Sequence, residues 1–98
     1  MLCALTVRKL QPGAWEDFKR CFLPDETEAP PGWSRFFAIR NVADEDEVVT
    51  FGFFDGTLEQ LRANQQGNEY DQRRAEAEQY VVSVGADGIF EVIDERSA

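Results

Sequence analysis

The sequence contains no histidine, and its two cysteines, Cys3 and Cys21, stand far apart in the chain. Without an imidazole, a heme iron cannot receive an axial histidine, and two distant thiols do not make a metal-ligand cluster. We therefore expect neither a metal ion nor a cofactor. Two cysteines are no disulfide framework either, so both are expected as free thiols.

Long hydrophobic runs are also missing. No segment approaches the ~20 apolar residues of a membrane-spanning helix, and nothing resembles a signal peptide before the first apolar run, which starts at Leu2. These absences predict a cytoplasmic protein. With 98 residues, the chain is expected to form one domain, residues 1–98.

Positive charge is scarce, with 10 lysines and arginines against 19 aspartates and glutamates and a net charge of −9. Such a chain has little to offer the phosphates of nucleic acid or the headgroups of an anionic membrane. Neither is an expected partner. The negative charge favours solubility and does not itself identify a ligand.

What the sequence does contain is an ordered series of strand and helix patterns. Apolar runs of strand type predict four strands, at residues 2–8, 33–40, 48–54 and 81–93. A first helix follows Pro12-Gly13 and carries Trp15, Phe18 and Phe22 on one face. A second begins at a Thr57–Gln60 capping box, with Leu58 and Leu61 as its buried side, and breaks at 66–68.

The connecting segments carry charge and glycine. The acidic loop 25–32, with two adjacent prolines, is interpreted as a stiff connector, with a lid as the alternative. The four carboxylates at 44–47 lack the spaced ligands of a calcium loop and are interpreted as a solvated hairpin tip. The glycines at 85–88 predict a bend or bulge in the last strand.

This order predicts an α+β protein with a ferredoxin-like βαββαβ protomer and an antiparallel sheet. Right-handed crossovers place both helical segments on one face of the sheet. Alternation puts Trp33, Phe37 and Ile39 on one face of the second strand, and Phe36 and Ala38 on the other. Because both faces are apolar, we expect a homodimer through the uncovered sheet face.

Several segments resemble the antibiotic biosynthesis monooxygenase-type family. They cover nearly the whole chain and read LQPGAWEDF at 10–18, LRAN at 61–64, NEYDQRR at 68–74, VVSV at 81–84 and DGIFEVI at 87–93. The resemblance implies a dimeric α+β barrel, in which two ferredoxin-like protomers meet sheet to sheet and each holds a ligand cavity between its sheet and helices. It also implies one of two chemistries, heme degradation or cofactor-free oxidation.

The residues required for heme degradation in this family are not present. Asparagine, tryptophan and histidine are needed, and the corresponding positions here are Thr6, Asn64 and Arg74. The cofactor-free reaction, in which an aromatic quinol or polycyclic phenol supplies its own electrons to oxygen, asks only for an apolar aromatic cavity with a few polar groups. The alternative is a non-catalytic dimeric module of the same fold that binds a small molecule or has a structural role.

Six residues are candidates for ligand binding. Arg74 would stabilise a phenolate, Asn64 or Tyr70 would orient it, and Trp33 and Phe37 would supply ring surfaces. Arg35 shares the strand face of Phe37, and a buried arginine needs a partner. Its expected partner is the other subunit, Glu91 or an anionic ligand. Each residue also has a plainer role, in the core or on a solvated helix surface.

Overall fold

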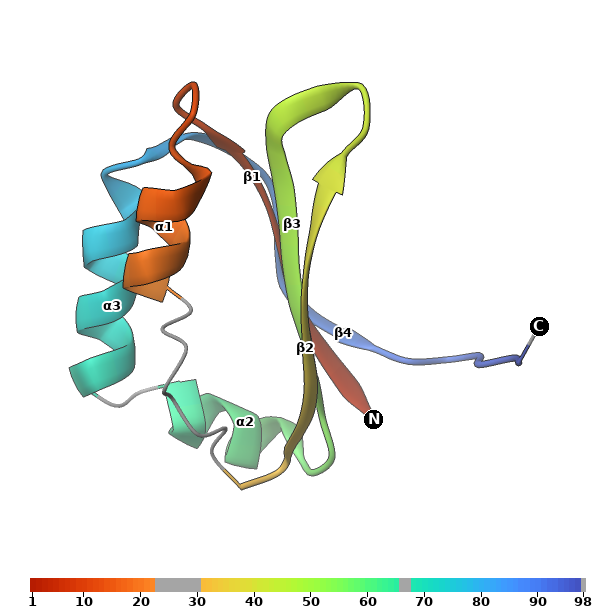
Figure 1. Ribbon diagram of the computed structural model, residues 1–98. Coiled ribbons are helices and arrows are strands. Elements are labelled where there is room, and N and C mark those ends of the chain that lie inside the picture. Colours follow the sequence, from red (N-terminus) through yellow and green to blue (C-terminus); the bar gives the residue numbers. More distant parts are fainter. Residues whose placement is uncertain (23–30, 66–67, 98) are drawn as a thin grey trace.

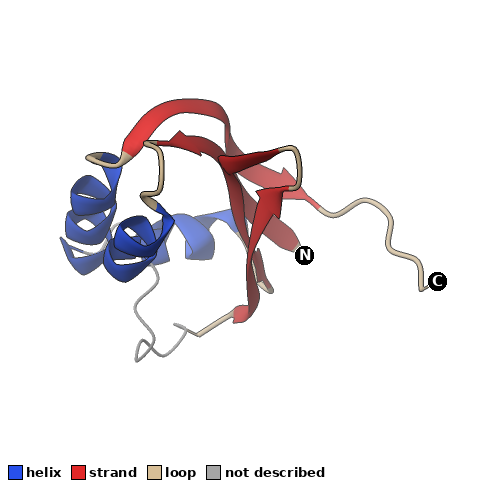
Figure 2. Ribbon diagram, turned by 45° about the horizontal axis from the view of Figure 1, so that its top comes forward, coloured by secondary structure: helices blue, strands red, loops and turns tan. Residues whose placement is uncertain are grey.

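The computed structural model describes residues 1–22, 31–65 and 68–97 (Figure 1). The described elements follow the order β1 (Leu2–Leu10), α1 (Trp15–Phe22), β2 (Trp33–Asn41), β3 (Asp44–Phe54), α2 (Leu58–Gln65), α3 (Asn68–Glu78) and β4 (Val81–Glu91). The strands form one antiparallel sheet in the order β2-β3-β1-β4. The helices all lie on one side of it (Figure 2). The predicted α+β, ferredoxin-like protomer is thus confirmed.

The sheet has a covered face and an open face. Along β3 the residues Val48, Thr50, Gly52 and Phe54 are buried, and the alternate residues are only half-buried. We call the first side the helix face and the second the open face. Cross-strand partners place these apolar residues on the open face: Leu5, Val7, Phe37, Ile39, Val49, Phe51, Phe53 and Phe90.

The centre of the core lies where α1 meets the sheet and α3. Phe18 is fully buried, and Leu10, Val48 and Ala77 are almost so. The aromatic side of α1 forms because its rings recur at helical spacing. The rings of Phe18 and Phe22 stack with centroids 5.3 Å apart. The predicted apolar face of this helix is confirmed.

One predicted side-chain direction is wrong. The register of β2 against β3 shifts between Trp33 and Arg35, so one extra residue, Ser34, is inserted there. Such a bulge reverses the alternation at its site. Trp33 therefore lies on the helix face, with its ring centroid 5.1 Å from that of Phe36 and 5.2 Å from that of Phe54. Beyond the bulge, the predicted alternation is confirmed.

The second helical region consists of two helices, and residues 66 and 67 between them lie outside the described part. The capping box is confirmed, because the Thr57 amide donates to Gln60 Oε1 and the Gln60 amide donates to Thr57 Oγ1. Leu61 is fully buried as predicted. The expectation for Leu58 is wrong: Leu58 is the first residue of α2 and is 41% exposed, and only Leu61, one turn further along, is packed.

The connections differ in detail from the expectation. The carboxylates at 44–47 belong to β3 and not to the hairpin tip, because Asn41 pairs with Asp44 and leaves Val42 and Ala43 in the turn. The predicted irregularity of the last strand is confirmed as a register shift between Val84 and Ala86. Residues 25–30 of the acidic loop lie outside the described part, and with them the interpretations of this loop as a connector or a lid. Cys3 and Cys21 are both free.

Candidate functional site

A row of polar side chains crosses the helix face of the sheet. In the register of the strands, Ala38 is opposite Thr50, Thr50 is opposite Thr6, and Thr6 is opposite Asp87. Residues opposite each other on one face lie about 5 Å apart. Thr6 donates a 2.9 Å hydrogen bond to Asp87 Oδ1. The helix face therefore presents hydroxyl and carboxylate groups in the middle of an otherwise apolar surface.

Arg8 is the buried cation of this face. Its side chain is 3% exposed and donates a 2.7 Å hydrogen bond to Thr50 Oγ1. The guanidinium lies 5.3 Å from the ring centroid of Phe18 and 4.6 Å from that of Phe22. Burying a charge is costly unless it is paired, and cation–π contacts with two rings offset part of that cost. Arg8 is thereby fixed between the sheet and α1.

Asp87 links this row to α3. Arg74 donates a 2.8 Å hydrogen bond to Asp87 Oδ2 and also forms a 3.6 Å ion pair with Glu78, one turn along the helix. Burial raises the pKa of Asp87, but the hydrogen bonds from Arg74 and Thr6 and the nearby charge of Arg8 outweigh it. The pKa therefore lies below its usual value. The carboxylate is ionised at neutral pH and is a weak base.

Aromatic rings lie next to the polar row on the helix face, over the position of Gly52. Gly52 lies one row beyond Thr50, and a Cβ built on it would be 2.7 Å from Phe36 and 3.0 Å from Trp33. The glycine is needed because the two rings cover this position so closely. Phe36 nevertheless remains 49% exposed. The helix face thus combines an accessible ring, small residues in the sheet and fixed polar groups.

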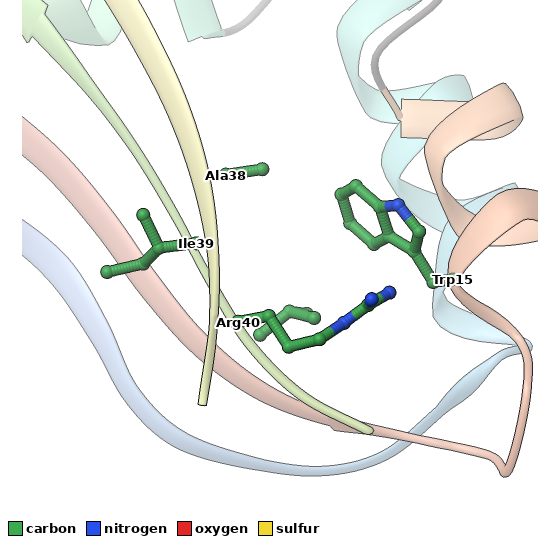
Figure 3. A pocket seen from close by; sticks show the side chains of 5 residues that line it. Trp15, Ala38, Ile39 and Arg40 are labelled. Atoms are coloured by element: carbon green, nitrogen blue, oxygen red, sulfur yellow. The ribbon is translucent and has the colours of Figure 1, made fainter. Parts of the chain in front are cut away.

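A pocket opens at the edge of this face, between β2 and α1 (Figure 3). Its volume is about 190 Å³, and its lining residues are Trp15, Ala38, Ile39, Arg40 and Val48. Arg40 extends toward the indole of Trp15, with its guanidinium 6.0 Å from the ring centroid. Ala38, which borders the pocket, is also the cross-strand neighbour of Thr50. The pocket therefore adjoins the polar row.

The structure divides the predicted binding residues between the two faces. Arg35 and Phe37 lie together on the open face, where the guanidinium is 4.8 Å from the ring centroid. No ion pair of Arg35 with another described residue is seen, Glu91 included. Trp33 lies on the helix face.

The other candidates come from the helices. Arg74 is directed at Asp87 and Glu78. Asn64 is half-buried near the end of α2, on a different helix from Arg74. Tyr70 belongs to α3, but its side chain lies outside the described part of the chain.

Sequence reasoning missed Arg8, Thr50 and Asp87. A signal for Arg8 was present, since the period of two that places Ala4 and Thr6 on one face places Arg8 there as well. Thr50 follows from the same rule along β3. Asp87 carries no comparable signal. Its position opposite Thr6 depends on the register of β4, which is irregular on both sides of Arg8.

Residues 1–22, 31–65 and 68–97 contain neither a cluster of metal ligands nor a membrane-spanning helix. Within these ranges, no group of three or more cysteine, aspartate or glutamate side chains is arranged so that it could hold a metal ion. No helix in the same ranges is long and apolar enough to cross a membrane.

The protein is a single-sheet α+β protein with the fold of solved structures described as antibiotic biosynthesis monooxygenases. One, described as a candidate monooxygenase of this kind from Deinococcus radiodurans, has a TM-score of 0.80 at 8% identity, covering 100% of this chain and 98% of that one. A similar candidate from Nitrosomonas europaea has a TM-score of 0.76 at 15% identity, covering 96% of this chain and 100% of that one.

A third similar structure is the protein Rv0793 from Mycobacterium tuberculosis. It has a TM-score of 0.71 at 17% identity and covers 98% of each chain. No family model matches the sequence. No curated protein matches it either. At these identities the likeness establishes the shared fold alone.

Proposed function

We propose that this protein is a cofactor-independent monooxygenase that binds an aromatic phenol or quinol against the helix face of its own sheet. The observation that carries the proposal is the arrangement on that face, where the rings of Trp33 and Phe36 adjoin a fixed row of polar groups at Thr50, Thr6 and Asp87. Ligand sites combine apolar walls with a few positioned polar groups in this way. The monooxygenase-type fold supports the same assignment.

The reaction needs no group beyond substrate and oxygen. In an anthrone-type phenol, a ring CH₂ becomes a carbonyl, one atom of O₂ enters the product, and the other leaves as water with the two displaced hydrogens. The substrate supplies all four electrons. The protein has to stabilise the phenolate and exclude bulk water. Arg8 is buried in the sheet beside Thr50, and its positive charge would stabilise the phenolate.

The test is oxygen uptake with a panel of hydroquinones and anthrones, corrected for the spontaneous reaction. We expect one O₂ consumed for each anthrone converted. Phe36→Leu should raise KM, since Phe36 is exposed on the helix face, whereas Phe37→Leu on the open face should change KM little. A rate equal to the uncatalysed one with every substrate would refute the enzymatic proposal.

One observation favours a second function, a non-catalytic module that binds an aromatic small molecule. Arg74 is paired with two carboxylates, and the pKa of Asp87 is lowered, so neither is well suited to move a proton. Saturable binding of a phenol without oxygen uptake would support this alternative. The protein would then use the same face for binding alone.

The proposal includes a homodimer through the open face. Phe51 and Phe53 contact Phe37 there, while Ile39 and Phe90 stay about half exposed. A contiguous apolar surface of this kind is unusual for a monomer, and a second copy of the sheet would cover it symmetrically. Sedimentation should show a dimer at micromolar concentration, and a monomer there would exclude this interface.

A further inference from the structure

The pocket between α1 and β2 pairs an aromatic wall with a cation. Trp15 contributes the indole on the helix side, and Arg40 reaches toward it from the edge strand (Figure 3). Ala38 and Val48 form an apolar floor. Arg40 is exposed, so its guanidinium is accessible to a molecule that enters from solvent.

Three of the four carboxylates that follow Arg40 in the hairpin accept hydrogen bonds or ion pairs from other donors. Asp44 pairs with Lys9, and Asp46 Oδ1 accepts a 3.1 Å hydrogen bond from the Gly13 amide. Glu47 Oε1 accepts one of 3.1 Å from Asn41. No ion pair between Arg40 and any other described residue is seen. In a chain with a net charge of −9, this pocket thus has a guanidinium at its rim that forms no ion pair with the described acidic residues around it.

We propose that this pocket binds the carboxylate of a single-ring aromatic acid. The ring would lie against the indole of Trp15, and the carboxylate would accept the paired N–H groups of Arg40. Guanidinium and carboxylate match each other in this two-pronged geometry. The assignment rests on the proposed function for the aromatic character of the ligand, and it adds the acidic group and the number of rings.

The size of the pocket sets the number of rings. A cavity of about 150 Å³ in another protein is sufficient for benzene. The pocket here, about 190 Å³, holds one ring with its carboxylate at the open side, where Arg40 stands. The pocket is open to solvent on that side, so a second ring would lie outside it. We therefore expect the pocket itself to hold a one-ring acid, or the acidic single-ring end of a larger substrate.

The test is a titration with sodium benzoate and its neutral analogue benzyl alcohol. In the Trp33→Phe variant, Trp15 is the remaining tryptophan of the two in the chain, so its emission reports the pocket. We expect saturable quenching by benzoate. Arg40→Gln should weaken benzoate binding about tenfold or more, as expected for loss of a charged hydrogen bond. Its effect on benzyl alcohol should be less than about twofold.

Arg35→Gln is the matched control, because Arg35 lies on the same strand but on the opposite face; its benzoate affinity should be unchanged. If Trp33→Phe does not fold, the indole N–H signals of the unsubstituted chain serve instead. The proposal is overturned by equal affinity for benzoate and benzyl alcohol, by an unchanged affinity in Arg40→Gln, or by no saturation. Benzoate is not oxidised, so this outcome is independent of the oxygen-uptake result.

Discussion

The guanidinium of Arg8 donates a hydrogen bond to the hydroxyl of Thr50 at 2.7 Å, across the two central strands of the sheet. The two residues lie 42 positions apart in the sequence, and both are buried. Arg8 is in addition enclosed by the rings of Phe18 and Phe22. Together these contacts join β1 and β3 to α1, and they fix the polar part of the proposed site.

Replacing Thr50 by valine should destabilise the protein by about 1–3 kcal/mol, because a buried guanidinium then loses an acceptor. Arg8→Leu should cost a similar amount or more. The double variant should lose less than the sum of the two, since the residues share one interaction. Urea unfolding of the four proteins measures this cycle. Strict additivity would mean that the hydrogen bond contributes nothing to stability.

Gly52→Ala should destabilise the sheet by about 1–3 kcal/mol, the usual cost of overpacking. Its added methyl would meet the Phe36 ring at 2.7 Å, so the ring has to move. Gly88→Ala is the control, because its nearest side-chain atom is 3.6 Å away. Thermal unfolding of both variants compares the two positions. If Gly52→Ala is as stable as Gly88→Ala, the rings do not cover this part of the helix face.

The lowered pKa of Asp87 predicts a pH dependence of stability. A carboxyl group whose pKa is lower in the folded chain than in the unfolded one stabilises the folded state only when ionised. This contribution is complete above a pH of about 4 and is lost as the pH falls through the folded pKa. Asp87→Asn should therefore flatten the acid limb of the curve of unfolding free energy against pH. An unchanged acid limb would show that Arg74 and Thr6 do not stabilise the ionised carboxylate.

The sequence predicted the fold well because the fold depends on local periodicity. Strand alternation, the aromatic spacing of α1 and the Thr57–Gln60 cap each follow from neighbours in the chain. The direction of Trp33 was not predictable, since Pro31 and Gly32 indicate only the turn before β2, and Ser34 itself carries no signal of a bulge. A single inserted residue moved a large ring from one face to the other.

The polar part of the site was harder to predict for a different reason. Charged residues are seldom fully buried, so alternation alone is weak evidence for placing Arg8 inside. Its burial depends on rings from α1 and on a hydroxyl from β3, which only the folded chain brings together. The contact of Arg74 with Asp87 likewise requires α3 to lie against β4.

The last prediction concerns Phe51 and the proposed dimer. Phe51 lies on a central strand, and full burial would make Phe51→Ala cost about 3–5 kcal/mol. In one protomer it is half-buried against Phe37, with ring centroids 5.0 Å apart, so the loss within that protomer should be smaller. A second copy on the open face would restore the full cost, and unfolding would then depend on protein concentration.

Phe36→Ala is the control: it removes the same side chain from the helix face and should leave the concentration dependence of unfolding intact. We expect the unfolding midpoint of the unsubstituted chain to rise over a roughly hundredfold increase in concentration, and that of Phe51→Ala to rise less. A midpoint independent of concentration in the unsubstituted chain would show that the open face is not a dimer interface.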